Sequence, residues 1–304
     1  MNKCVGCGAT LQSNNKDLSG YVKDLEFKYC ERCFRNRNYS EIKEQELSSS
    51  NQDIINKINE SADITFFITD FLNISSEVIK LYNKIKTTKY LVINKMDVIP
   101  KDLRPEKIIK FLADVYKIND KVLFTSYKDS NLINYFKDNK NIYFCGVTNS
   151  GKSSLISKIT GNKEITSSSM INTTLDYLTF SYDKYQIVDC PGFNIDINII
   201  DNKLLKIINP NKALKIRNYQ LKEKTILNIH DLIKIGFVTK NKVSCYVSNG
   251  LLISKEYHWE DLKELNIPSN SDLIILGIGF LNIKEKGKIV IDKNLKYEIR
   301  KSIF

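Results

Sequence analysis

The eight residues Gly146 to Ser153, GVTNSGKS, have the types and spacing of a loop that binds nucleotide phosphates. An apolar run precedes them and helix-forming residues follow. Glycines let successive backbone N–H groups surround a β-phosphate at the start of a helix, where the helix dipole favours negative charge. Lys152 would reach the β- and γ-phosphates, and the Ser153 hydroxyl would bind Mg²⁺. The alternative is a chance glycine-rich turn. Phosphate contacts are predicted at Gly146, Asn149, Ser150, Gly151, Lys152, Ser153 and Ser154.

A second polar group, Asn94, Lys95, Met96 and Asp97, follows the apolar run 90–93. The Asp97 carboxylate can accept hydrogen bonds from guanine N1 and the 2-amino group. Adenine offers neither donor, so a buried unpaired carboxylate would reject ATP. Lys95 would lie along the base, and Asn94 would tie this loop to the phosphate loop. Four polar residues at a strand end are common alone, but the pairing with GVTNSGKS favours a guanine nucleotide.

Two further segments suit the same chemistry. Asp189 to Gly192, DCPG, closes the apolar run 185–188. Asp189 would hold Mg²⁺ through water, and the Gly192 N–H would sense the γ-phosphate. Thr174 is predicted to close on Mg²⁺ when the γ-phosphate is present, although Thr173 and Thr174 also suit an ordinary strand start.

The remaining nucleotide contacts concern the base and the attacking water. Ser126 and Tyr127 would place a backbone N–H at guanine O6. Phe193 follows Gly192, and a phenyl ring cannot orient a water molecule, so slow intrinsic turnover is expected. Similarity to GTPases that lack the water-orienting glutamine and have an Asn at this position of the phosphate loop implies that Asn149 holds K⁺ between the β- and γ-phosphates. The predicted catalytic residues are Asn149, Lys152, Thr174 and Gly192.

Four cysteines near the N-terminus form two CxxC pairs, Cys4 with Cys7 and Cys30 with Cys33, separated by 22 residues. Two such pairs at this separation predict a four-thiolate zinc site. A redox dithiol or two disulfides are the alternatives. So short a segment has little core, and metal binding would supply most of its stability.

Between these motifs, apolar and amphipathic segments alternate, which predicts a parallel sheet with helices on both faces. The predicted strands are 64–69, 90–93, 122–124, 142–145 and 185–188, and the predicted helices are 76–86, 106–116 and 132–137, after a polar linker at 47–52. The last third is predicted to be a small, mostly β, α+β domain with a helix over 226–233.

The base loop precedes the phosphate loop, the reverse of the order in ordinary GTPases. The usual ends are joined and the chain is reopened after DCPG, which defines a circular permutation. With its motifs CVGCGATLQ, YCERCFRNRNY, NKMD, GVTNSGKSSL, NTTLD and DCPG, and the block DLIILGIGFLNI, the sequence resembles the YqeH family of circularly permuted GTPases. Tyr127, where most GTPases have Ala, and Asn172, where the family tends to have Gly, depart from that pattern.

The resemblance implies an α/β fold: a circularly permuted P-loop GTPase domain (46–202), an N-terminal treble-clef-like zinc finger (1–45) and a smaller, mostly β C-terminal domain (203–304) that binds RNA. It implies GTP hydrolysis, with GTP or GDP, Mg²⁺, Zn²⁺ and K⁺ as ligands, and assembly of the small ribosomal subunit on its rRNA. A non-enzymatic RNA-binding scaffold with GTP as a structural ligand, and a GTPase acting on another RNA or on protein, are the alternatives.

Charge and hydropathy bear on the partner and the location. Residues 201–304 carry 19 Lys or Arg and 11 Asp or Glu, so most of the net charge of +11 lies there. A basic domain suggests a nucleic-acid partner, although a lysine-rich solvated surface gives the same count. No run is long enough for a membrane span, and no signal peptide stands at the N-terminus. A cytoplasmic monomer without membrane contact is expected.

Overall fold

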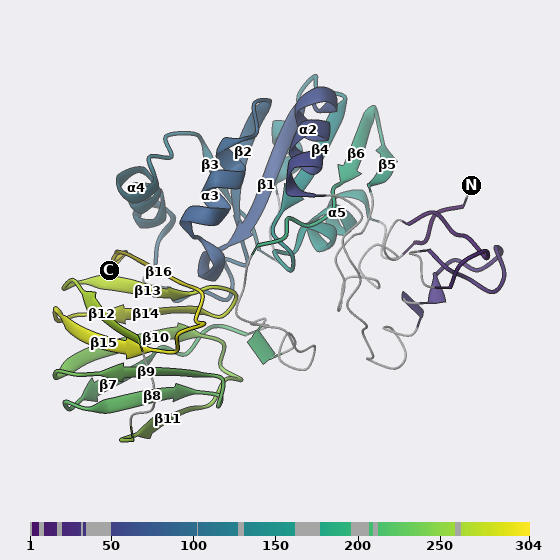
Figure 1. Cartoon of the computed structure of the whole chain (residues 1–304). Helices are drawn as coiled ribbons and strands as arrows, with labels where there is room; N and C mark the ends of the chain where they lie inside the picture. The colour runs from purple at the N-terminus through teal and green to yellow at the C-terminus, as the bar shows by residue number, and fades with distance from the viewer. Residues whose placement is uncertain are drawn as a thin grey trace. The chain divides into compact units, whose positions relative to one another are not determined.

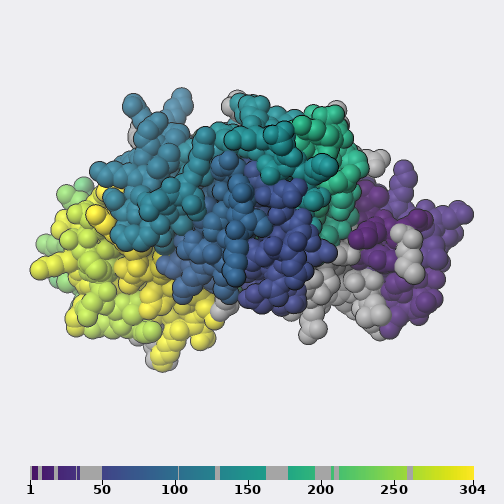
Figure 2. Space-filling model, turned by 90° about the horizontal axis from the view of Figure 1, so that it is seen from above, coloured from purple at the N-terminus to yellow at the C-terminus, as the bar shows by residue number. Residues whose placement is uncertain are grey.

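A computed structural model gives the fold (Figure 1). It describes residues 2–5, 9–16, 20–31, 33–34, 50–101, 103–126, 131–161, 177–195, 207–208, 212–258 and 263–304. The chain divides into two compact units. Unit 1 comprises Met1–Asp70, Glu77–Met96 and Asp120–Ile195, and unit 2 comprises Phe71–Ser76, Asp97–Asn119 and Asp196–Phe304. Figure 2 shows the surface coloured along the chain.

Unit 1 is built on a six-stranded sheet with strand order β3-β2-β1-β4-β6-β5 (Figure 1). The strands are β1 (Ile64–Asp70), β2 (Thr88–Asn94), β3 (Val122–Phe124), β4 (Asn141–Gly146), β5 (Leu178–Tyr182) and β6 (Tyr185–Asp189). All neighbours pair in parallel except β5 and β6. Every residue of β1 is buried, as expected of a central parallel strand covered on both faces. The predicted parallel sheet is confirmed.

The helices of the first two-thirds of the chain are α2 (Asn51–Ser61), α3 (Ser76–Asn83), α4 (Pro105–Tyr116) and α5 (Lys152–Thr160). Helix α2 begins inside the segment predicted as a polar linker. Ser50 and Asp53 form a reciprocal capping box at its start, and Ile54, Ile55 and Ile58 are buried. The linker prediction was wrong at this end because the cap residues are polar and the apolar face begins only after them.

The helix predicted over 132–137 is a single 3-10 turn, η2 (Leu132–Tyr135). Lys137 has a φ of +50°, a left-handed conformation that cannot continue a right-handed helix. None of the described helices is long and apolar enough to span a bilayer.

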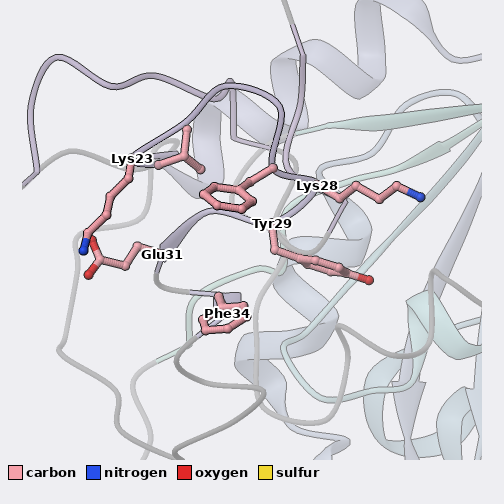
Figure 3. Close-up of a pocket in the computed structure, with 7 residues that line it drawn as sticks. Lys23, Lys28, Tyr29, Glu31 and Phe34 are labelled. Carbon is pink, nitrogen blue, oxygen red and sulfur yellow. The ribbon is translucent and has the colours of Figure 1, made fainter.

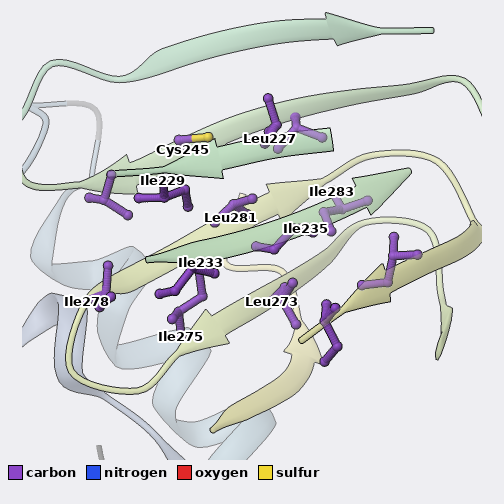
Figure 4. Packing of buried hydrophobic residues seen from close by; sticks show 14 of the residues in the cluster. Leu227, Ile229, Ile233, Ile235, Cys245, Leu273, Ile275, Ile278, Leu281 and Ile283 are labelled. Atoms are coloured by element: carbon purple, nitrogen blue, oxygen red, sulfur yellow. The ribbon is translucent and has the colours of Figure 1, made fainter. Parts of the chain in front are cut away.

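Unit 2 contains two five-stranded antiparallel sheets, with strand orders β16-β13-β14-β10-β7 and β11-β8-β9-β15-β12. The strands are β7 (Arg217–Leu221), β8 (Thr225–Ile229), β9 (Ile233–Phe237), β10 (Asn241–Val247), β11 (Ile253–Glu256), β12 (Lys263–Ile267), β13 (Ser271–Ile275), β14 (Gly279–Ile283), β15 (Gly287–Ile291) and β16 (Tyr297–Lys301). Alternate residues of both sheets point into one shared core, which Figure 4 shows from close by.

The helix predicted over 226–233 is wrong: these residues form strand β8, a tight turn and the start of β9. Leu227 and Ile229 point into the core at every second position. His230 and Asp231 both have positive φ and form the centre of a turn in which the Leu232 amide donates to the carbonyl oxygen of Ile229 at 3.1 Å. A short apolar run has no clear period, so its sequence does not separate helix from strand.

The outer face of the sheet that contains β13, β14 and β16 is covered by the first two stretches of unit 2. The ring of Phe71, in the 3-10 segment η1 (Phe71–Asn73), packs edge-on against Phe280 at 5.5 Å between centroids. Arg300 is 5% exposed and donates to the carbonyl oxygen of Ile74 at 2.6 Å and to the Tyr116 hydroxyl at 3.1 Å. The segments that follow β1 and the base loop are therefore integral to unit 2.

Candidate functional site

The predicted base loop and the phosphate loop are joined by hydrogen bonds. The side-chain amide of Asn94 donates to the carbonyl oxygen of Ser150 at 2.9 Å, across 56 residues of sequence. The Lys95 ammonium donates to the carbonyl oxygen of Asn149 at 2.7 Å and to the Asp70 carboxylate at 2.9 Å. Two segments whose order in the chain is reversed thus meet in one place.

The parallel sheet explains this meeting. Strand β4 ends in the phosphate loop, β1 lies beside it, and β2 lies beside β1 and ends in Asn94. Because the carboxyl ends of parallel strands share one edge of a sheet, the loops that follow them lie together there. Which loops lie together is decided by the order of the strands in the sheet, and not by their order along the chain.

The backbone of the phosphate loop requires its glycines. Gly146 has a φ of +142°, and a Cβ there would lie 2.0 Å from the carbonyl oxygen of Ile68. Gly151 has a φ of +91°, and a Cβ there would lie 2.4 Å from the Asn94 amide nitrogen. Both positions combine a left-handed or extended positive φ with a close backbone or side-chain approach, which only glycine tolerates.

The side chains at the start of α5 fit a phosphate and a magnesium ion. Lys152 is only 6% exposed, and within the described residues no ion pair or hydrogen bond holds its ammonium group. A buried cation needs an anionic partner, and a nucleotide phosphate would supply one. The Ser153 hydroxyl donates to the Asp189 carboxylate at 2.7 Å, so two oxygen donors of the kind Mg²⁺ prefers are adjacent. Ser154 is exposed on the next position of the helix.

The DCPG turn lies against the phosphate loop. A Cβ on Gly192 would lie 2.8 Å from the Thr148 hydroxyl oxygen. The Phe193 amide donates to the carbonyl oxygen of Gly146 at 2.9 Å. The Phe193 ring is fully buried and stacks on Phe67 at 5.6 Å between centroids. Its side chain therefore belongs to the core of unit 1 and cannot orient an attacking water molecule.

The part of the site predicted to bind guanine is described only in part. The Met96 amide donates to the carbonyl oxygen of Thr125 at 3.1 Å, which fixes the base loop against the strand end that precedes Ser126. Asp97 is exposed and Ser126 is half-buried. Tyr127, Thr173 and Thr174 lie outside the described residues, so their predicted roles stay predictions.

Three contacts of this site were absent from the sequence interpretation. Asp70 pairs with Lys95, and the Thr125 hydroxyl donates to the Asn94 side-chain oxygen at 2.9 Å. Asn51, at the start of α2, exchanges two hydrogen bonds with the backbone of Asn194, at 2.6 and 2.9 Å. Asp70 and Thr125 each directly follow a predicted strand, at the edge of the sheet that carries the loops. Their position in the sequence could therefore have indicated that they belong to the site.

Three of the four predicted zinc cysteines lie together. The sulfur atoms of Cys4, Cys30 and Cys33 are within 4.8 Å of one another, and all three side chains are buried. Backbone amides of Cys30 and Cys33 point at the sulfurs of Cys4 and Cys30, an arrangement that stabilises thiolates. Tetrahedral zinc with Zn–S bonds of about 2.3 Å would suit this donor set. Cys7, the fourth predicted ligand, lies outside the described residues.

A cavity of about 450 Å³ adjoins this cluster (Figure 3). It is lined mainly by apolar and aromatic side chains, with two lysines and one glutamate: Val22, Lys23, Phe27, Lys28, Tyr29, Glu31 and Phe34. Phe34 is 54% exposed there. Arg35, Arg37 and Tyr39, which follow in the sequence, lie outside the described residues.

The cysteines outside the two CxxC pairs, Cys145, Cys190 and Cys245, are buried. Burial raises the pKa of the Cys145 thiol well above its usual value, and it does the same at Cys190. Both lie next to the phosphate loop or in DCPG but remain protonated thiols at neutral pH.

The joined base and phosphate loops, on a parallel sheet whose strands are connected in this order, define a circularly permuted P-loop GTPase. The predicted resemblance is confirmed as well: the chain is 29% identical to YqeH of Bacillus subtilis over 283 residues, which cover 83% of this chain and 77% of that protein.

Two family models and a further relative also name GTPases. Residues 64–197 match the family model described as RsgA GTPase, and residues 141–266 match the one described as 50S ribosome-binding GTPase. GTPase Der of Mycoplasma mycoides is 31% identical over 170 residues, 49% of this chain and 39% of that protein. The crystal structure of GNP-bound YlqF from T. maritima is 19% identical, with a TM-score of 0.34, over 50% of this chain and 60% of that one. Each of the last two relatives is thus matched over less than two-thirds of its own length.

Proposed function

We propose that this GTPase assists assembly of the small ribosomal subunit, and that its nucleotide state sets how tightly it holds ribosomal RNA. The observation that carries the proposal is the hydrogen bond between the base and phosphate loops, in a chain that resembles YqeH over 83% of its length. The basic C-terminal third supports an RNA partner because cations on one domain attract the phosphate backbone. Zinc on the four cysteines would stabilise the finger as a second RNA contact.

Coupling to the nucleotide follows from the permutation. The chain passes through Gly192, whose N–H would sense the γ-phosphate, and enters unit 2 at Asp196. Loss of the γ-phosphate would therefore act on a segment that leads directly to the RNA-binding strands. Such coupling requires the GTP and GDP states to bind the partner with different affinity.

Hydrolysis needs a substitute for a water-orienting glutamine, since Phe193 is buried. Asn149 has a φ of +62°, and its carbonyl oxygen accepts from Lys95, which holds this residue in the phosphate loop. An Asn149 side chain that holds K⁺ would offset charge that develops between the β- and γ-phosphates. The hydrolysis rate should therefore be higher in K⁺ than in Na⁺ and lose that difference in Asn149→Ala. Equal rates in the two salts would remove Asn149 from the catalytic residues.

Sedimentation on gradients of separated ribosomal subunits tests the proposal. The full chain should travel with small subunits when a non-hydrolysable GTP analogue is present and leave them when GDP replaces it. Lys152→Ala, which removes the phosphate-binding ammonium, should not respond to nucleotide. Migration with large subunits would instead favour the function named by the 50S ribosome-binding family model. No association with either subunit would refute a ribosomal role.

A further inference from the structure

The β-sandwich of unit 2 has two ends, and the strand connections divide between them. Four connections cross from one sheet to the other at the same end: 222–224, 238–240, 268–270 and 284–286. The registers place them together. Leu221 pairs with Asn241 and Ile283 pairs with Val243 in one sheet, and Thr225 pairs with Phe237 in the other. We call this surface the lysine end and define it by those four connections.

The two ends differ in charge. The lysine end carries five lysines and two glutamates: Lys222, Lys224, Lys240, Lys284, Lys286, Glu223 and Glu285. The described connections at the opposite end, 230–232, 248–252, 276–278 and 292–296, carry two lysines and two aspartates. The positive charge of the turns is therefore concentrated at one end of the sandwich and cancels at the other.

The lysines of this surface are available for a partner. Within the described part of the chain none of the five is in an ion pair, whereas Lys234 and Lys288 on the sheet face are paired with Glu256 and Glu264. All except the half-buried Lys284 are exposed.

Backbone hydrogen bonds hold the turns in place. The Asn241 side chain donates to the carbonyl oxygen of Glu285 at 2.9 Å and accepts from the amide of the same residue at 3.2 Å. The Lys284 amide donates to the carbonyl oxygen of Lys242 at 3.1 Å. The cationic side chains thus project from a rigid base, which reduces the entropy lost on binding.

The opposite end has a different character. Its exposed large apolar side chains are Leu232 and Leu252, 47% and 72% exposed. The four connections of the lysine end carry no exposed large apolar side chain. Tyr257, 63% exposed, lies beside them, because it follows Glu256, which pairs with Ile226 near the start of β8. Protein interfaces have an aromatic or apolar centre, whereas contacts to nucleic-acid backbones are made mostly by cations and polar groups.

We propose that the lysine end is the surface through which the chain binds the phosphate backbone of RNA. This inference rests on the proposed function, whose RNA partner it accepts, and it adds the location and the mode of contact. Because such contacts read the backbone and not the bases, single-stranded and duplex RNA should both bind. Each lysine that contacts a phosphate releases condensed counterions, so affinity should fall steeply with salt.

The test measures binding of the full chain to a fluorescein-labelled single-stranded RNA and to a duplex RNA of the same length, across a salt series. The variant Lys284→Gln/Lys286→Gln is compared with Lys293→Gln/Lys296→Gln, which removes two charges at the opposite end. For the single strand, Lys284→Gln/Lys286→Gln should make the negative slope of log affinity against log salt shallower by about 1.4, since each phosphate contact contributes about 0.7. The control should keep the wild-type slope, and Lys284→Arg/Lys286→Arg should restore it.

The outcomes separate this inference from the proposed function. Equal losses in the two Gln variants would show that only net charge matters and would overturn the lysine end as the surface. Wild-type protein that binds neither RNA, while still sedimenting with small subunits, would overturn both the surface and the RNA part of the proposed function. Melting temperatures of all variants verify that the sandwich is folded, so a loss of binding cannot be assigned to unfolding.

Discussion

The side-chain amide of Asn94 fills the space beside Gly151 that any larger residue would need. The two residues are 57 positions apart, yet a Cβ on Gly151 would lie 2.4 Å from the Asn94 nitrogen. That nitrogen in turn holds the carbonyl oxygen of Ser150. The absence of a side chain at Gly151 therefore lets the predicted base loop pack against the phosphate loop.

Gly151→Ala is expected to weaken GTP binding by at least about 10-fold, which corresponds to roughly 1.4 kcal/mol. The added methyl group would displace Asn94 and strain a backbone with a φ of +91°. Calorimetric titration with GTP measures the effect. Gly161→Ala is the matched control, because Gly161 also has a positive φ, +71°, but no atom within 4 Å of the added Cβ. Similar losses in both variants would assign the effect to backbone strain alone.

Much of unit 1 was predictable from the sequence because each of its motifs directly follows a strand. Each motif ends a buried apolar run, so the parallel sheet and the meeting of the base and phosphate loops follow from strand ends alone. Unit 2 was less predictable. The run 226–233 mixes apolar residues with Asn228, His230 and Asp231, a pattern that suits a helix as well as a hairpin, and only its tertiary pairing makes it a hairpin. The cover formed by 71–76 and 97–119 could not be foreseen, since it depends on contacts with residues about 180 to 225 positions away.

The finger should bind one zinc ion per chain. Cys30→Ser should abolish zinc binding, measured by plasma mass spectrometry, and unfold the finger, since its three described sulfurs lie within 4.8 Å around so small a core. Cys245→Ser, a change at a cysteine distant in sequence and buried in the sandwich, should keep the metal. Zinc-free wild-type protein with all four finger thiols resistant to labelling until reduced would indicate disulfides instead.

Arg300 should be among the most sensitive positions of unit 2. Its side chain lies 3.5 Å from the Asp272 carboxylate, with both almost fully buried. Burial raises the pKa of Asp272, and Arg300 opposes that rise. Arg300→Met should lower the free energy of unfolding by about 3–5 kcal/mol, because it leaves a buried carboxylate without its cation.

Urea denaturation followed by circular dichroism measures this loss. The double variant Arg300→Met/Asp272→Asn should lose less than the sum of the single changes, because the two side chains interact. Lys301→Met, an exposed neighbour, serves as the control. Additive losses would mean that the pair contributes nothing as a pair.

Cys245 gives a prediction for alkaline pH. Burial raises the pKa of its thiol from 9.0 to about 12, against a smaller opposing effect of Arg217. Between these values the unfolded chain loses the proton while the folded chain keeps it, so stability falls as pH rises above 9. From pH 8 to pH 10 this thiol should cost about 1.4 kcal/mol. Cys245→Ala should show a correspondingly smaller fall in urea midpoint, and an unchanged fall would exclude the thiol as the cause.

The two hydrogen bonds between Asn51 and Asn194 join the start of α2 to the segment that follows β6, so the first and last parts of the six-stranded domain are in contact. The chain that arrives from the finger and the chain that leaves β6 for the last part of unit 2 therefore meet at one junction. Gly192 stands two residues before that junction. A rearrangement of the backbone at Gly192 would consequently act both on the start of α2 and on the chain that leaves this junction.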